Sequence, residues 1–553
     1  MSNPTLQYKK ESTVAVTENA KRLFQVVYKE ANKDEEEESN VPVVRVSSLI
    51  SKMAFYYEKL RNYVDYKEEH LMRKNAILRI LKRQIVIEGV LREQESEEIA
   101  KHLIVELIRA GYLPNNKVPE VKIVEIAEVI NKYLKLKKYS LASLNKLIND
   151  YKERVNLVNW IIALAACDIE ERLVHNRVEK VILNSAFEIL TTRLRLPENS
   201  PYEADKELQV YISIDRNFMK FDQEMISFVV FKYYNNWTNA TELEIKAIGE
   251  NILALRQAID KQVNHPLAGQ LNKIVIRYSV YFSVLAGVIK KNPVAVYENL
   301  KSDIKSFPRD IKEVCKKKYA QAQSRLWRAG MRSIIYIFLT KSVFAVLLEV
   351  PATIWFGDKV NYFFLGVNAS FPAILLFLII LFTSIPSDKN TEKIIEGINE
   401  IVFEDKKNKE PINLREAVKR GGVINGVFGF IYFITFFVSF GFIVWGLNKI
   451  GFNFVSIVIF LFFLAFVSFF AIRIRRDTKE LVVVEAKENI IIFVCDFFSV
   501  PIIAVGKWLS EKFSKINVFV FILDFIIEAP FKIFVEVAEE WTKYVKERKD
   551  EIS

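Results

Sequence analysis

The chain has 553 residues, of which 51% are hydrophobic and 13% aromatic, and its formal net charge is +11. Its length predicts two or more domains, and its three widely separated cysteines (Cys167, Cys315 and Cys495) argue against a disulfide framework or a cysteine-based zinc site. The positive charge does not indicate nucleic-acid binding, because the basic residues gather beside an apolar run instead of forming a stripe.

Residues 1–45 are polar and include the acidic run Asp34–Glu38. A segment of this composition cannot bury enough apolar surface to order itself, so we expect a disordered tail. The first residues (MSNPTLQYKK) also lack the apolar stretch of a signal peptide. Together with the few cysteines, this predicts a reducing, cytoplasmic location for the N-terminal part of the chain.

Residues 46–300 are predicted to form a cytoplasmic α-helical domain. Apolar residues return at intervals of three and four in successive segments, which is the periodicity of helices with one buried face. The segments with this pattern are 49–64, 77–85, 99–107, 121–134, 240–263 and 268–291.

Three further stretches of this domain need an interpretation. Residues 157–167 and 278–289 are strongly apolar but too short to cross a bilayer, so we expect them in the central helices of a bundle. Residues 207–215 alternate between polar and apolar side chains, as a strand does. A single strand does not make a sheet, so the predicted fold class stays all-α.

A basic segment over 301–333 precedes the most apolar part of the chain and is predicted to be a juxtamembrane helix. Basic residues beside a transmembrane helix mark its cytoplasmic end and attract anionic lipids. The side chains expected to contact lipid head groups are Lys312, Lys316, Lys317, Lys318, Arg325, Arg328 and Arg332.

Four apolar runs follow, each close to the roughly 20 residues that cross a bilayer core. They predict transmembrane hairpins over 334–385 and 422–473, joined by a cytoplasmic linker over 386–421. For the linker the sequence is equally compatible with two structures, a short amphipathic helix and a solvated connector. The four runs cover 334–356, 361–385, 423–447 and 453–472.

The distribution of charge predicts the orientation of these crossings. The links inside the two hairpins carry almost no charge, whereas the link between the hairpins and the end of the fourth run are rich in lysine and arginine. Basic segments stay inside, so both termini are expected to be cytoplasmic. We interpret 474–553 as amphipathic interfacial or re-entrant helices followed by a charged C-terminal helix. Six crossings would instead put Lys507, Lys512 and Lys515 outside.

Charged residues inside the apolar runs indicate a candidate intramembrane polar site. Lys341 and Glu349 are eight residues apart on one helix face, about 12 Å along the axis at 1.5 Å per residue, so we expect no direct neutralisation. Each needs a partner elsewhere, or Lys341 extends to the cytoplasmic surface. The tail offers partners at helical intervals. The full candidate set is Lys341, Glu349, Asp496, Asp524, Glu528 and Lys532.

Other motifs are few. Gly422 and Gly426 form a GxxxG pair, which allows another helix to approach closely. The sequence has no P-loop, no GxGxxG after a strand, no HExxH and no GxSxG, and its four histidines are isolated. We therefore expect no catalytic residues, no cofactor, no metal ion and no nucleic-acid partner.

Two segments carry a resemblance to other proteins. They are MAFYYEKLRNYVDYKEEHLMRKNAILRILKR (53–83) and IYIFLTKSVFAVLLEVPATIWF (335–356). Together they resemble uncharacterised helical membrane proteins of bacteria with reduced genomes. The resemblance implies a prokaryotic inner (plasma) membrane and carries no established activity.

The leading functional hypothesis is a non-enzymatic inner-membrane scaffold or assembly protein. Its cytoplasmic helical domain would recruit a protein partner, while the basic helix and the tail hold it against the bilayer and its anionic lipids. Two alternatives stay open: an oligomeric transporter or channel using the intramembrane charges, and a membrane enzyme acting on lipid. Whether the chain forms a homo-oligomer also stays open.

Overall fold

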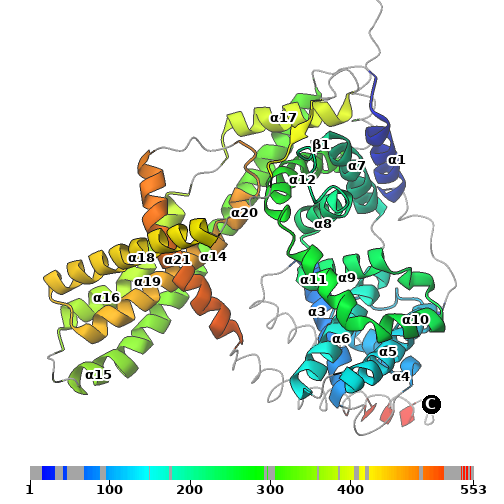
Figure 1. The fold of residues 1–553 in the computed structure, drawn as a ribbon, viewed down its shortest axis with the longest axis horizontal. Coiled ribbons are helices and arrows are strands. Elements are labelled where there is room, and N and C mark those ends of the chain that lie inside the picture. The colour runs from blue at the N-terminus through cyan, green and yellow to red at the C-terminus, as the bar shows by residue number, and fades with distance from the viewer. Residues whose placement is uncertain are drawn as a thin grey trace, which may run out of the picture. The chain divides into compact units, whose positions relative to one another are not determined.

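The computed structural model describes residues 15–31, 42–46, 68–87, 95–147, 150–173, 177–291, 306–355, 360–383, 386–403, 410–416, 422–484 and 490–515, together with a few isolated positions. The described residues are almost entirely helical, which confirms the all-α prediction. They form two compact units (Figure 1). The N-terminal unit contains Arg22–Val275 and Lys409–Glu416, and the apolar unit contains Ile276–Asn408 and Ala417–Phe521 together with the first residues of the chain.

The N-terminal unit is a helical bundle with one large apolar core. Figure 1 labels its helices, and the described ones are α3 (Glu69–Lys82), η2 (Arg83–Ile87), α4 (Ser96–Arg109), α5 (Val121–Leu147), α6 (Tyr151–Leu173), α7 (Arg177–Arg193), α8 (Lys206–Phe218), α9 (Gln223–Tyr234), η4 (Trp237–Asn239), α10 (Glu242–Glu250), α11 (Ile252–Val263) and the first part of α12 (Ala268–Lys291).

Local sequence signals explain where several of these helices begin and end. The backbone of Gly111 has a φ of +77°, which suits glycine, and it closes the turn directly after α4. Thr241 and Glu244 form a reciprocal capping box at the start of α10. The predicted helices at 77–85, 99–107, 121–134 and 268–291 are confirmed, whereas the one at 49–64 lies outside the described residues. The segment 240–263 forms two helices, α10 and α11, which are separated at Asn251.

One expectation about this part of the chain is wrong. The first 45 residues are not all disordered, because α1 (Glu18–Ala31) forms there and buries an apolar stripe. Residues 207–215, whose short alternating pattern resembles that of a strand, lie in α8, in agreement with the all-α prediction. The described strands are two-residue segments, β1 (Leu194–Arg195) and β2 (Ile412–Asn413), which pair in parallel. The stripe of α1 is Ala20, Leu23, Phe24 and Val27.

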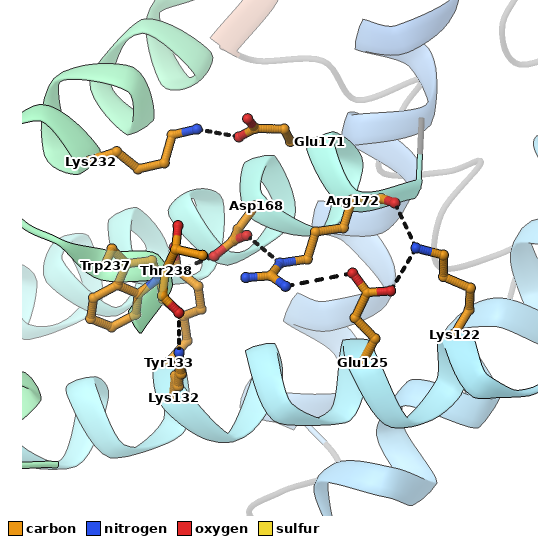
Figure 2. A network of polar contacts seen from close by, with 10 residues as sticks. All are labelled: Lys122, Glu125, Lys132, Tyr133, Asp168, Glu171, Arg172, Lys232, Trp237 and Thr238. Carbon is orange, nitrogen blue, oxygen red and sulfur yellow. Dashed lines mark hydrogen bonds and ion pairs between the residues drawn. The ribbon is translucent and has the colours of Figure 1, made fainter. Parts of the chain in front are cut away.

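Asp168 is the centre of a polar network that joins α5, α6 and η4 (Figure 2). Its carboxylate accepts hydrogen bonds from Trp237 Nε1 at 3.1 Å, Tyr133 Oη at 3.3 Å and Arg172 Nε at 2.9 Å. Arg172 also lies 3.6 Å from Glu125. Because these donors surround the carboxylate, the network stabilises helix packing and leaves no acceptor poised for catalysis.

Asp215 in α8 differs from Asp168, because one of its carboxylate oxygens is buried and accepts no hydrogen bond from a described residue. Burial raises the pKa of Asp215 from the ordinary value of 3.8 to about 7; Lys232 opposes the rise and Glu171 adds to it. The carboxyl group of Asp215 therefore binds its proton more tightly in the folded state than in the unfolded state.

This raised pKa predicts a pH-dependent stability. The contribution of Asp215 is fully present below about pH 4 and is lost as the pH rises through about 7, because the folded state binds the proton more tightly than the unfolded state. We expect Asp215→Asn to raise the melting temperature more at pH 8 than at pH 5, measured by thermal unfolding of the full chain in detergent. The exposed Asp260→Asn is the control, and an equal shift at both pH values would contradict the assignment.

The apolar unit contains a bundle of long helices. Its described helices are the second part of α12, α14 (Phe307–Phe344), η5 (Ala345–Glu349), α15 (Val350–Trp355), α16 (Tyr362–Leu381), α17 (Asp388–Val402), α18 (Gly422–Ile450), α19 (Phe454–Ile474), α20 (Arg476–Lys479) and α21 (Ile490–Lys515).

The basic segment and the first apolar run form one continuous helix, from Phe307 to Trp355 (Figure 1). Its 49 residues correspond to about 73 Å at 1.5 Å per residue, more than twice the roughly 30 Å of a bilayer core. The predicted boundary at 333/334 therefore lies within one continuous helix and does not separate two helices.

Within the described residues, six helices are long and apolar enough to cross a membrane. Four of them contain the predicted runs, and the other two are Ala268–Lys291 and Phe493–Lys512, so the count of four is not confirmed. Large apolar side chains such as Phe430 and Phe442 are 63% and 71% exposed on α18. Surfaces of this kind need lipid around them, which is the character of a membrane protein.

The predicted linker contains a helix, α17, whose apolar face is buried against α14. Asn390 of α17 is 2% exposed and binds two segments, α14 and residues 481–484. Its amide donates to Tyr319 Oη and the Leu481 carbonyl, both at 2.9 Å. Its oxygen accepts from the backbone amides of Val483 at 2.7 Å and Val484 at 3.1 Å.

We expect Asn390→Leu to release residues 481–484 from α17. The substitution leaves buried backbone groups without partners, at about 1–3 kcal/mol each. Hydrogen exchange at the amides of Val483 and Val484 should accelerate by at least tenfold. Lys389→Leu, at the exposed neighbouring position, is the control. Unchanged exchange in Asn390→Leu would show that the side chain does not hold this segment.

Candidate functional site

The intramembrane charges of the first apolar run lie in a cluster built by three helices of the bundle. Lys341 comes from α14, Glu349 ends the π-helical turn η5, and α16 and α19 contribute Asn368 and Ser456. Pro351 follows Glu349 by two residues. It has no amide hydrogen and crowds the carbonyl one turn back, so a wide π-helical turn accommodates it.

Three of the four side chains of the cluster are withdrawn from the surface, and the fourth, Ser456, is half-buried. Lys341, Glu349 and Asn368 are 0%, 1% and 0% exposed. Glu349 Oε1 accepts hydrogen bonds of 2.6 Å from both Asn368 Nδ2 and Ser456 Oγ. Lys341 Nζ lies 3.7 Å from Glu349 Oε2 and 4.5 Å from the centre of the Phe463 ring. The ammonium group is thus held by a carboxylate and an aromatic face.

The expectation that Lys341 and Glu349 cannot neutralise each other is wrong. It treated residues 341–349 as regular α-helix, whereas the π-helical turn η5 takes up one extra residue. Eight residues then rotate the chain like seven, roughly 700° instead of roughly 800° at about 100° per residue, which aligns the two side chains more closely along the helix face. Their long stems cover the remaining axial distance. Lys341 also does not extend to the surface, as its full burial shows.

A second set of polar contacts supports the cluster at the N-terminus of α19 and in α15. Asn453 caps α19 by accepting a hydrogen bond from the Ser456 amide at 2.8 Å, and its Nδ2 donates to Thr353 Oγ1 at 3.2 Å. The first contact positions Ser456, and the second joins α15 to α19. The turn before Asn453 contains Gly451, whose φ of +98° favours glycine.

Among the predicted tail residues, the structure describes Asp496 and does not bring it to this cluster. Asp496 in α21 is exposed and has no described contact with Lys341 or Glu349. Asp524, Glu528 and Lys532 lie outside the described residues. The partners of Glu349 are instead Asn368 and Ser456, which the sequence reasoning missed. A polar amide within an otherwise apolar run could have indicated Asn368, because such groups bind across helices in membranes.

The basic side chains of α14 are arranged unevenly. Lys318 is half-buried and donates to Ser283 Oγ of α12 at 2.9 Å, so this side chain faces protein. The other six, all exposed, are Lys312, Lys316, Lys317, Arg325, Arg328 and Arg332. Their contact with lipid head groups stays a prediction.

The close helix approaches described in the bundle use glycines other than Gly426, where an added Cβ would meet nothing described within 4 Å. The surroundings of Gly422 lie outside what the structure describes. At Gly506 of α21, by contrast, an added Cβ would lie 1.9 Å from the Ala465 carbonyl oxygen of α19. At Gly330 of α14 it would lie 2.3 Å from Ile380 Cδ1 of α16. These two glycines permit the observed packing.

The chemistry available at the cluster is that of a buried ion pair with hydrogen-bond donors around the carboxylate. Within the described residues there is no group of three or more histidine, cysteine or acidic side chains that could hold a metal ion. Cys167 is fully buried, and burial raises the pKa of its thiol well above the ordinary range, which makes it inert. The hydrogen bonds and the ion pair of the cluster join α14, η5, α16 and α19.

Comparison of the chain with protein-family models, with curated proteins and with solved structures finds no match. The resemblance of 53–83 and 335–356 to membrane proteins of reduced-genome bacteria receives no support from these comparisons.

Proposed function

We propose that this chain is a membrane-embedded scaffold whose N-terminal helical unit recruits a protein partner from the cytoplasm. The observation that supports the proposal is that the two intramembrane charges are buried and paired with each other. Lys341 and Glu349 are 0% and 1% exposed and lie against each other. Charges on a transport path need access to water, whereas charges that join helices are paired and covered.

The surface of the N-terminal unit supports the recruiting role. Several large apolar side chains of this unit point to solvent, and such groups are common at protein interfaces. Leu243 in α10 and Tyr151 in α6 are each 81% exposed, and Tyr233 in α9 is 62% exposed. The exposed basic side chains of α14 would hold the chain against anionic lipid.

We further propose that α12 stays outside the bilayer. Its second half packs against charged segments of α14: Lys291 Nζ lies 2.8 Å from Glu313, and Lys318 reaches Ser283. Neighbours of this kind suit water better than hydrocarbon.

We propose that α21 enters the hydrocarbon core. It packs against Ala465 and Ser439, near the middle of α19 and α18, and Figure 1 shows it running across these helices instead of beside them. A re-entrant segment fits this placement better than a helix lying on the surface. Both termini then stay cytoplasmic, in the inner membrane of a prokaryote.

Photo-crosslinking in intact cells tests the scaffold proposal. A photoreactive amino acid at Leu243 or Tyr151 should give crosslinked products of discrete mass in the membrane fraction. Phe433, which is 58% exposed on α18 and expected to face lipid, is the control and should give none. Absence of protein crosslinks at both test positions would overturn the proposal.

Flux measurements separate the scaffold from a transporter. Liposomes that contain the full chain should show no Na⁺, K⁺ or proton flux above protein-free liposomes. A flux that disappears in Glu349→Gln would favour a conduit instead.

A further inference from the structure

The intramembrane cluster contains three buried polar atoms that make no hydrogen bond with any described residue. They are Lys341 Nζ, Glu349 Oε2 and Asn368 Oδ1. The separation of 3.7 Å between Lys341 Nζ and Glu349 Oε2 is too long for a hydrogen bond. The set therefore comprises one donor group and two acceptors, each withdrawn from the surface of the protein.

The orientation of the Asn368 amide is determined by its other contacts. Nδ2 donates to Glu349 Oε1 at 2.6 Å and to the Ser456 carbonyl at 3.3 Å, which uses both of its hydrogens. The amide oxygen is roughly 2.3 Å from its own nitrogen by covalent geometry. Asn368 Oδ1 therefore lies within about 5 Å of the Glu349 carboxylate.

We propose that one ordered water molecule binds in this cluster and joins α14, η5 and α16. A water molecule accepts a hydrogen bond from Lys341 Nζ through a lone pair and donates its two hydrogens to Glu349 Oε2 and Asn368 Oδ1. This arrangement satisfies all three atoms at once. Buried waters in proteins make about three hydrogen bonds to groups that otherwise lack partners.

The same geometry disfavours a metal ion as the occupant. Oxygen atoms of Glu349 and Asn368 are ligands that Na⁺ or Mg²⁺ could use. The Lys341 ammonium, however, lies 3.7 Å from the carboxylate and would repel a second cation at this position. A neutral molecule with two donors and one acceptor avoids this repulsion. The inference concerns the bundle itself and is independent of whether the chain recruits a partner.

Electron cryo-microscopy of the full chain in lipid nanodiscs, with a bound antibody fragment to aid alignment, tests the proposal. At a resolution that shows ordered water, we expect one peak within 3.2 Å of all three atoms, equally strong in sodium buffer and in sodium-free choline buffer. A peak lost without sodium would identify a cation. A direct contact between Lys341 Nζ and Glu349 Oε2 below 3.2 Å without a peak would also overturn the proposal.

Two variants distinguish the water from general disorder of the site. Ser456→Ala removes a donor to Glu349 Oε1, which the water does not contact, so the peak should remain. Asn368→Leu removes one of the three groups that bind the water, so the peak should disappear. Loss of the peak in Ser456→Ala, or its persistence in Asn368→Leu, would contradict the assignment. If Asn368→Leu does not fold, the wild-type and Ser456→Ala maps still decide.

Discussion

Replacing Lys341 with methionine should destabilise the apolar unit by about 3–5 kcal/mol, because it leaves the Glu349 carboxylate buried without a counter-charge. Methionine keeps the length of the side chain and its contact with Phe463, so the lost charge is the main change. The measurement is unfolding of the purified protein in detergent by increasing denaturant or temperature. Glu349→Gln should have a similar effect, since it leaves the ammonium group unpaired.

Two controls separate this effect from a general response to charge. Lys393 and Glu396 form an ion pair in α17 with side chains both 61% exposed, so Lys393→Met should leave stability unchanged. The double variant Lys341→Met, Glu349→Leu removes both buried charges and should recover much of the lost stability. Equal stability of Lys341→Met and Lys393→Met would show that the buried pair is not a structural contact.

Adding a single methyl group at Gly506 should separate α21 from α19. A Cβ there lies 1.9 Å from the Ala465 carbonyl oxygen, which is backbone and cannot rotate away. The two helices must therefore move apart, which also disturbs the hydrogen bond of 2.9 Å between Ser439 Oγ and the Phe498 carbonyl. We expect a large loss of stability in Gly506→Ala and a larger one in Gly506→Val.

Cysteine crosslinking between α18 and α21 measures the accompanying displacement of α21. In a chain whose own cysteines are replaced, cysteines at positions 439 and 498 should crosslink efficiently, and Gly506→Val should lower the yield several-fold. Gly426→Ala is the matched control, because a Cβ at Gly426 meets nothing described within 4 Å. A crosslinking yield in Gly506→Val equal to that of Gly426→Ala would contradict the observed helix approach.

The physical class of the chain was predictable because it depends on composition and local periodicity. Runs of about 20 apolar residues indicate bilayer-spanning helices wherever they occur. The linker also contained a local signal for one of its two possible structures, the helix that forms as α17. This signal is the helical spacing of Ile394, Ile398, Ile401 and Val402. The prediction of a disordered tail failed where a short pattern was too weak to be recognised, as at Leu23 and Phe24 in α1.

The partners within the site were not predictable in the same way. The sequence identified Lys341 and Glu349 as charges that need neutralisation, since hydrocarbon penalises an isolated charge. It could not show that a π-helical turn brings them together, because eight residues of regular helix leave them about 12 Å apart. It also could not select Asn368 and Ser456 over Asp496 as neighbours of Glu349.

Amino-acid sequence alone therefore determined that this is an all-α chain with apolar helices and that two charges lie within the first of them. Only the tertiary structure decided that these charges face each other between α14, α16 and α19, and that Gly506, not Gly426, meets another described helix. The physical reason is that hydropathy and helical period are properties of neighbouring residues along the chain. Pairing and close approach depend on the rotation and depth of separate helices, which no single segment specifies.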